Sequence, residues 1–283
     1  MVDNASTDGS APLVRQWHPR IVLIVNQQNV GFGAAVNQGV ASCSSEYVLV
    51  LNSDTRVMPG TTEALGGYLN HHPGVAVVGP RLINPGGRLV SSCHAFPTLL
   101  PTLLEESAVW SLLQHVPVLR EAYPRTASHA RPRRVAWVEG AAMAIRRAAF
   151  ETVGGFDPSF FLYFEEVDLC YRLARAGWEV HFAPVGTVMH IGGASTRRYR
   201  SDMAVMALAS RLRFYRKHYS RLRLAGLVPL VQAIVLARWL LGPIRVRLTR
   251  DDERRSELRD DLVAWGRVLR GEWLRSPVSG PSR

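Results

Sequence analysis

The chain has 283 residues, of which 47% are apolar and 20% are charged. These values are ordinary for a globular protein and exclude wholesale disorder and collagen-like or low-complexity architecture. The three cysteines, Cys43, Cys93 and Cys170, share no metal-type spacing, which excludes a disulfide scaffold and a structural zinc cluster and favours a reducing compartment.

The net charge of +11 is concentrated in the C-terminal part of the chain. Residues 1–196 contain 14 basic and 15 acidic residues, a net charge of −1, whereas residues 197–283 contain 20 basic and 8 acidic residues, a net charge of +12. A cationic segment of this kind can bind nucleic acid or rest on the anionic surface of a membrane, so composition leaves both classes of partner open.

The first third of the chain predicts alternating strands and helices. Short apolar runs at 21–25, 47–51 and 75–79 are typical of buried strands. A turn and a small-residue helix are expected over 29–39, and a second helix begins at Pro59 and ends near Asn70. This order is that of an α/β domain with a parallel sheet and crossover helices.

The middle of the chain is less regular. The leucine-rich stretch 99–119 is either a packed helix or loop, or an apolar lip that faces a lipid or an acceptor. Further on, the pattern predicts strands and helices in alternation and then a glycine-rich loop: a strand over 135–146, helices over 147–153 and 167–176, a strand over 178–183, and the loop over 190–196.

The C-terminal part predicts helices. One with a basic face is expected over 203–219 and a charged amphipathic one over 251–271. The apolar run 224–241 lies between them. It is too short for a bilayer span and is interrupted at Pro229, so a membrane-spanning helix is not our first choice. We expect an interfacial helix flanked by arginines, and a helix packed on the body of the protein is the alternative.

Two side chains could hold a metal ion. Asp54 follows the strand at 47–51, and carboxylates at the carboxyl ends of parallel strands face the crevice where α/β sheets bind ligands. Because hard oxygen ligands suit Mg²⁺ and Mn²⁺, Asp54 can hold such a cation against a diphosphate, unless it is a solvated turn residue. His190 is either a metal ligand or a polar surface residue.

Three acids stand within four residues, at Glu165, Glu166 and Asp168, beside several aromatic residues. Crowded carboxylates next to aromatic side chains should have raised pKa values, which suits a general base. On a helix that begins near Glu165, the acids would also favour the positive end of the helix dipole, so a capping role for Asp168 stays open.

Six motifs occur in an order that resembles the bacterial family 2 glycosyltransferases, and most of all their rhamnosyltransferase-like branch. They are Asp3-Asn-Ala-Ser-Thr-Asp-Gly-Ser10, Asn29-Val-Gly-Phe-Gly, Leu51-Asn-Ser-Asp-Thr55, Gly154-Gly-Phe-Asp157, Glu165-Glu166 and His190-Ile-Gly-Gly-Ala-Ser. The resemblance covers residues 2 to about 200. It implies a GT-A fold, with a Rossmann-like, mostly parallel sheet flanked by helices, over residues 1–200, followed by a helical extension over residues 201–283.

The resemblance also implies an activity. A sugar such as rhamnose would move with inversion from a nucleoside-diphosphate donor to a hydroxyl of a glycan or lipid-linked acceptor in cell-envelope polysaccharide synthesis. A divalent cation, Mg²⁺ or Mn²⁺, would be the cofactor. The enzyme would be cytoplasmic and peripheral at the inner membrane surface, with no nucleic-acid partner.

Site residues follow from the same motifs. Asp3 would contact the nucleobase and ribose, and Asn29 would lie near the nucleotide. Asn52 and Asp54 stand where the family has its Asp-x-Asp, with an asparagine that leaves the metal one charge short, and His190 would be the second protein ligand of the metal.

The catalytic and acceptor residues are implied in the same way. Glu166 falls where the family has its catalytic base, usually an aspartate, and Glu165 and Asp168 would orient the acceptor and the base. The acceptor side would be lined by Trp137, Gly140, Phe161 and Tyr163.

The beginning of the sequence departs from the family pattern. A strand and a helix normally precede the aspartate that matches Asp3, which is here the third residue. We therefore expect the true start to lie upstream of Met1, because otherwise the sheet would lack a strand and half of the nucleotide pocket. Two other classes stay open: a catalytically impaired remnant that binds nucleotide sugars, and a membrane- or nucleic-acid-binding module that acts through the basic tail.

Overall fold

The computed structural model describes residues 1–18, 20–98, 129–192 and 200–272, which form two compact units. The first unit contains the described residues 1–18, 20–96 and 129–192. The second contains the described residues 97–98 and 200–272. The stretch 99–119 and most of the loop expected at 190–196 lie outside the described residues.

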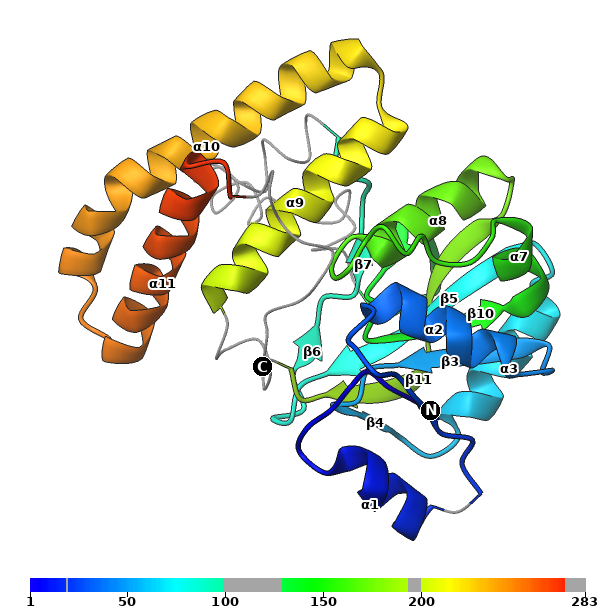
Figure 1. Cartoon of the computed structure of the whole chain (residues 1–283). Coiled ribbons are helices and arrows are strands. Elements are labelled where there is room, and N and C mark those ends of the chain that lie inside the picture. Colours follow the sequence, from blue (N-terminus) through cyan, green and yellow to red (C-terminus); the bar gives the residue numbers. More distant parts are fainter. Residues whose placement is uncertain (19, 99–128, 193–199, 273–283) are drawn as a thin grey trace. The chain divides into compact units, whose positions relative to one another are not determined.

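A mixed sheet of seven strands forms the centre of the first unit (Figure 1). Its main path, in hydrogen-bonded order, is β3 (Tyr47–Leu51), β10 (Ala142–Arg146), β5 (Val75–Ile83), β11 (Glu179–His190) and β4 (Thr55–Val57). Two short strands extend it: β6 (Leu89–Val90) pairs with β5, and β8 (Arg133–Val135) pairs with β11. Strands β3, β5 and β11 run in one direction, and β10 lies antiparallel between β3 and β5.

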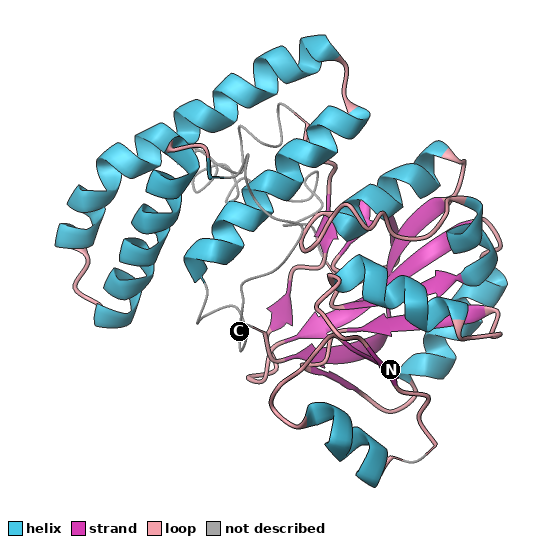
Figure 2. Ribbon diagram, viewed as in Figure 1, coloured by secondary structure: helices cyan, strands magenta, loops and turns pink. Residues whose placement is uncertain are grey.

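Helices cover both faces of this sheet (Figure 2). The helices packed against it include α2 (Phe32–Ala41), α3 (Thr61–His71), α7 (Arg147–Thr152) and α8 (Glu165–Arg175). Successive residues of β10 point to opposite faces, so Met143 and Ile145 pack in the cluster that includes α8, whereas Ala144 packs in the cluster that includes α3. The predicted α/β class is confirmed, but the expectation of a mostly parallel sheet is wrong. Among the described strands of this sheet, β5 and β11 pair in parallel and the other pairs are antiparallel, because β10 inserts between β3 and β5.

Two predicted strands have different bounds in the structure. The strand expected over 135–146 is wrong as a single element, because a turn at Gly140 separates β10 from β9 (Trp137–Val138). Strand β9 pairs instead with β7 (Cys93–His94) in a separate sheet. The strand expected over 178–183 is confirmed but continues as β11 to His190, so this histidine ends a strand and does not lie in a loop.

The N-terminal segment forms a small sheet of its own. Strand β1 (Val2–Asp3) pairs in parallel with β2 (Ile24–Val25), and within the described ranges neither strand pairs with the seven-stranded sheet. The strand expected over 21–25 is thus confirmed only at its end. Helix α1 (Ser10–Trp17) between them buries none of its residues.

The described residues of the second unit form the helices α9 (Arg200–His218), α10 (Arg221–Leu248) and α11 (Asp252–Leu269), which pack against one another. Helix α10 continues through Pro229 and Pro243, so the interruption expected at Pro229 is wrong. A proline removes one backbone donor, and contacts with neighbouring helices can hold the rest of the helix together. In the described part of the chain, α10 is the one helix long and apolar enough to cross a membrane, with a mean hydropathy of 1.9 over 18 residues.

Candidate active site

The residues expected to hold the nucleotide lie in a hydrogen-bonded network at the carboxyl ends of β1 and β2. Asp3 is buried. Its neighbour Asn4 donates from Nδ2 to Asn29 Oδ1 at 2.8 Å and to the carbonyl of Gly31 at 3.2 Å. Sequence reasoning gave Asn4 no role, although it stands inside the first motif. Its side chain ties the Asp3 and Asn29 segments together.

Gly31 approaches the segment that precedes α8. Its φ of +87° is left-handed, and a Cβ at this position would lie 2.6 Å from the carbonyl oxygen of Phe161, so only glycine fits. The backbone N–H of Phe32 donates to that same oxygen at 3.0 Å. Tyr163 and Phe164 also have positive φ angles, of 65° and 67°, a conformation that costs energy for residues with side chains. The Asn29 loop is therefore fixed to the segment that carries Phe161 and Tyr163.

Asp54 and His190 face one another, as expected for a pair of metal ligands. His190 Nε2 lies 3.2 Å from Asp54 Oδ1. The pairing of β4 with β11, which sets His190 opposite Thr55, fixes this arrangement, and the N–H of Ile191 donates to the Asp54 carbonyl at 3.0 Å.

The spacing of these two side chains fits a divalent cation. Two ligands at right angles around Mg²⁺, each at about 2.0–2.1 Å, lie about 3 Å apart. No group of three or more His, Cys, Asp and Glu side chains suited to a metal occurs among the residues that the structure describes. A cation bound by Asp54 and His190 would thus leave most of its coordination positions to phosphate oxygens and water.

Glu165 and Glu166 begin α8, where Glu165 is buried and Glu166 is half-buried. The Oε2 atom of each is inaccessible to solvent and has no hydrogen-bond partner in the described ranges. Burial raises the pKa of Glu165 to about 7. Burial, with the negative charges of Glu165 and Glu139, raises the pKa of Glu166 well above its usual range. Raising the pKa of a carboxyl group towards the operating pH makes its deprotonated form a stronger base, which suits general-base chemistry.

Asp168, the third acid of the cluster, is engaged differently. It is fully buried, and its Oδ2 accepts a hydrogen bond of 2.7 Å from Nε of Arg172. Arg172 also donates to the carbonyls of Val153 and Gly155, each at 2.6 Å. This pairing fastens α8 to the turn after α7 and favours a structural role for Asp168 over contact with the acceptor.

Gly140 connects the acid pair with the expected metal loop. The backbone N–H of Asn52 donates to the carbonyl of Ala141 at 3.0 Å. One residue earlier, a Cβ on Gly140 would lie 3.7–3.8 Å from three carbons of the Glu166 side chain. Asn52 and Glu166 are thus neighbours through a single turn, at the edge of the sheet where β3 ends.

Trp137 is held in a stacked arrangement that sequence reasoning missed. Its ring stacks on His94 at 4.0 Å between centroids and 15° between planes, and its Nε1 donates to the carbonyl of Ala95 at 2.9 Å. His94 Nε2 lies 2.7 Å from Glu139 Oε1. The sequence analysis assigned no role to Glu139 or His94, and His94 reaches Glu139 only through the pairing of β7 with β9.

Comparisons with known proteins cover this whole site. Residues 1–207 match the family model described as "Glycosyltransferase like family 2". An N-acetylglucosaminyl-diphospho-decaprenol L-rhamnosyltransferase of Mycobacterium tuberculosis is 32% identical over 209 residues, which are 70% of this chain and 67% of that protein. The rhamnosyltransferase WbbL of Escherichia coli is 35% identical over 80 residues, 28% of this chain and 30% of its own.

A solved mannosyltransferase of Pyrobaculum calidifontis is similar with a TM-score of 0.48 and 17% identity, covering 95% of this chain and 76% of that one. The stretch that matches the family model contains every residue assigned above to the site, from Asp3 to His190.

Proposed function

This chain belongs to the glycosyltransferase like family 2 and has its GT-A fold, and from that premise we propose that it is an inverting rhamnosyltransferase. The donor is a nucleoside diphosphate rhamnose, and the acceptor is a hydroxyl of a sugar carried on a polyprenyl diphosphate. This donor and acceptor are supported by the relative from Mycobacterium tuberculosis, whose name gives both the transferred sugar and the lipid carrier.

The observation that carries the proposal is the pair of glutamates that begins α8, each with one carboxylate oxygen inaccessible to solvent. A hydroxyl is a poor nucleophile until a base removes its proton. Glu166 takes the proton from the acceptor hydroxyl, whose oxygen bonds to the anomeric carbon. The bond from that carbon to the diphosphate oxygen breaks on the opposite face, and the electron pair leaves with the nucleoside diphosphate. Glu165, buried beside it, orients the base.

Asp54 and His190 would hold the divalent cation. Bound there, Mg²⁺ or Mn²⁺ offsets the negative charge that grows on the leaving diphosphate. One carboxylate oxygen and one imidazole nitrogen, 3.2 Å apart, suit such an ion. Asp3 and Asn29 position the nucleoside, and Asn52 lines the same loop as Asp54. Trp137, Gly140, Phe161 and Tyr163 form the acceptor side.

We place the enzyme in the cytoplasm, peripheral at the membrane surface. Helix α10 has an apolar face that lacks a partner in the described residues, with Leu240 and Ile244 more than half exposed. The charged helix α11 packs along α10, which favours a position in the interface over one across the bilayer. Arginines at both ends of α10 can reach lipid phosphates.

The test replaces the base without changing its shape. In Glu166→Gln, sugar transfer to an N-acetylglucosaminyl-diphospho-prenol of short chain should fall roughly 10²-fold or more, because the base is lost. Binding of the donor, measured by calorimetry, should be unchanged. The matched control is Glu151→Gln, at an exposed position of α7, which should transfer as the wild type does. Wild-type turnover in Glu166→Gln would overturn the assignment of the base.

A further inference from the structure

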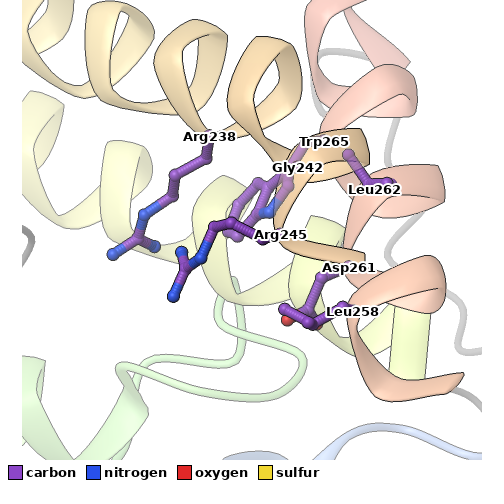
Figure 3. Close-up of a pocket in the computed structure, with 7 residues that line it drawn as sticks. All are labelled: Arg238, Gly242, Arg245, Leu258, Asp261, Leu262 and Trp265. Atoms are coloured by element: carbon purple, nitrogen blue, oxygen red, sulfur yellow. The ribbon is translucent and has the colours of Figure 1, made fainter. Parts of the chain in front are cut away.

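Charged side chains outside the assigned site occur in both units. In the second unit, Arg238, Arg245 and Asp261 line a hollow between α10 and α11 (Figure 3). In the first unit, His94 and Glu139 form a pair, with Nε2 of the histidine 2.7 Å from Oε1 of the glutamate. This pair adjoins the base of the proposed reaction through the turn at Gly140.

His94 is held in place by its surroundings. It is buried, and its ring stacks on Trp137 at 4.0 Å between centroids. The backbone of β7 is bonded as well, because the N–H of Ala136 donates to the His94 carbonyl at 3.1 Å and β7 pairs with β9. Stacking and backbone pairing leave the ring little freedom to turn, so its Nε2 has a fixed direction.

Glu139 is in a different environment, because its side chain is 37% exposed. A glutamate with this access to water normally spreads over several rotamers, since water solvates its charge in each of them. An ionised carboxylate only accepts hydrogen bonds, so Nε2 of His94 donates to it. His94 therefore selects one orientation of the Glu139 side chain.

This orientation matters because Glu139 lies next to Glu166. Gly140 follows Glu139 directly, and a Cβ on that glycine would lie 3.7–3.8 Å from Cβ, Cγ and Cδ of Glu166. The negative charge of Glu139 helps to raise the pKa of Glu166, after burial and the charge of Glu165. The interaction of two charges weakens with distance and with screening by water, so a Glu139 side chain turned into solvent would act less on the base.

Other titratable groups near Glu166 lie on α8 or just before it. Glu165 is its neighbour on the helix, and its charge contributes to the same rise in pKa. Burial raises the pKa of Tyr163 above its usual range and that of Cys170 to about 12, so both side chains are neutral near pH 7. Among the described groups whose charge raises the pKa of Glu166, Glu139 is the one outside α8.

The elements packed against α8 add no competing charge that lacks a partner of its own. Helix α2 and strand β9 contain no titratable side chain. On β11, His181 pairs with Glu179 and His190 pairs with Asp54. The charge that another element places beside Glu166 is thus that of Glu139, and β7 holds it through His94.

We propose that His94 is a positioning residue for sugar transfer, which holds the carboxylate of Glu139 beside Glu166 and so sets the pH range in which Glu166 acts as the base. The proposal rests on the base assigned in the proposed function. It gives the small sheet of β7 and β9 a role in the reaction in addition to packing.

The first test removes the charge of Glu139 and keeps its shape. In Glu139→Gln the pKa of Glu166 should fall, so the acid limb of the kcat/KM profile should move to lower pH by roughly half a pH unit or more. At a fixed pH on that limb, kcat/KM should then rise about threefold or more. An acid limb at the wild-type position, or a higher KM for the acceptor without a shift of the limb, would overturn the proposal.

A second histidine–glutamate pair of the same unit provides the matched control. His181 Nε2 lies 2.9 Å from Glu179 Oε2, and the two side chains are 14% and 39% exposed, close to the 10% and 37% of His94 and Glu139. Glu179 begins β11, at the opposite end of that strand from His190. Glu179→Gln loses the same charge from the same kind of pair, and its acid limb should stay at the wild-type position.

The second test asks whether His94 acts through Glu139. His94→Phe keeps a ring that can stack on Trp137 but has no N–H to donate, so its acid limb should move in the same direction as that of Glu139→Gln. When both substitutions are combined, the limb should lie where Glu139→Gln alone places it. Shifts that add in the double variant would show that His94 acts by another route and would overturn the proposal.

His94→Gln guards against misfolding of the phenylalanine variant. Its amide nitrogen can replace Nε2 as a neutral donor to Glu139, so the acid limb should stay at the wild-type position. A purely structural role of His94 predicts instead that these variants change the melting temperature and leave all the profiles in place. A limb shifted in His94→Gln as far as in Glu139→Gln would also overturn the proposal.

The Glu166→Gln assay separates this proposal from the proposed function. Wild-type turnover in Glu166→Gln would overturn the assignment of the base and the role of His94 together. Loss of turnover in Glu166→Gln, with an unmoved acid limb in Glu139→Gln, would overturn the role of His94 alone.

Discussion

Glu165 and Glu166 each keep one carboxylate oxygen away from water and without a hydrogen-bond partner in the described part of the chain. Such a site favours the neutral acid, so folding binds protons that the unfolded chain would release. For Glu165 the pKa rises to about 7. Its contribution to stability is fully present below the pKa of an exposed glutamate, about 4.3, and is lost as the pH rises towards 7.

Replacing Glu165 by glutamine should therefore change the free energy of unfolding only at pH values above the pKa of an exposed glutamate, about 4.3. The melting temperature of Glu165→Gln should match that of the wild type at pH 4.5 and exceed it at pH 8, by about 2–4 °C for each kcal/mol of relief. Thermal unfolding at both pH values measures this, with Glu151→Gln as the exposed control. A gain of equal size at both pH values would contradict the burial argument.

The same variant should move the pH dependence of catalysis. The negative charge of Glu165 is one of the causes that raise the pKa of Glu166, so its removal lowers that pKa. The base is then unprotonated at lower pH, and the acid limb of the kcat/KM profile should shift to lower pH. An acid limb at the wild-type position would show that Glu166 does not set it.

Pairs of strands position the expected metal ligands. Asp54 precedes β4 and His190 ends β11, so the register between these two strands places both side chains. A shift of one residue in that register would turn His190 to the other face of the sheet. The pair therefore depends on contacts between elements that are distant in the sequence.

Asp54→Ala and His190→Ala should each weaken the binding of Mn²⁺ measured with a nucleoside diphosphate present. Each removes one of two protein ligands, and we expect a loss of tenfold or more. His71→Ala, an exposed histidine of α3, is the control and should bind as the wild type does. If a chelator leaves sugar transfer intact, the cation has no role in the reaction.

Local sequence patterns predicted the elements whose formation depends on nearby residues and not on pairing with distant ones. Strands β3 and β5 and helices α2 and α3 follow from apolar runs, small residues and Pro59. The division at Gly140, by contrast, comes from the pairing of β9 with β7, which no local pattern reveals. The continuation of α10 through Pro229 likewise depends on packing with other helices.

The same distinction applies to the site. The motifs named Asp54, Glu166 and His190. In the structure His190 Nε2 lies 3.2 Å from Asp54 Oδ1, and the side chain of Glu166 lies beside Gly140. The engagement of Asp168 with Arg172 could not be separated in advance from a role at the acceptor, because both fit a charged residue near a helix start. His94 has no signal at all in the sequence around it.

On the scale of the whole molecule, charge and structure divide the chain in a similar place. Residues 1–196 carry a net charge of −1 and residues 197–283 a net charge of +12, while the described part of the helical unit begins again at residue 200. We propose a catalytic domain over residues 1–200 and a membrane-binding extension over residues 201–283.

A chain that ends at Ser201 should then stay soluble and bind the donor as the full chain does, but should not sediment with anionic vesicles. The full chain should sediment with them and be partly released by salt, because each cation near the surface contributes about 1 kcal/mol. Calorimetry and sedimentation measure the two properties separately. Aggregation of the shortened chain, with no vesicle binding by the full one, would indicate that the extension packs on the domain and does not serve a membrane.

The contact between Gly31 and Phe161 has a consequence for the order of events in a catalytic cycle. The loop that carries Asn29 and the segment that carries Tyr163 share one backbone hydrogen bond, and no side chain can be inserted between them. If Asn29 binds the donor and Tyr163 faces the acceptor, as proposed above, a displacement of the loop on donor binding would move the segment on the acceptor side. In kinetic terms, we expect bound nucleoside diphosphate to change the affinity of the enzyme for its acceptor.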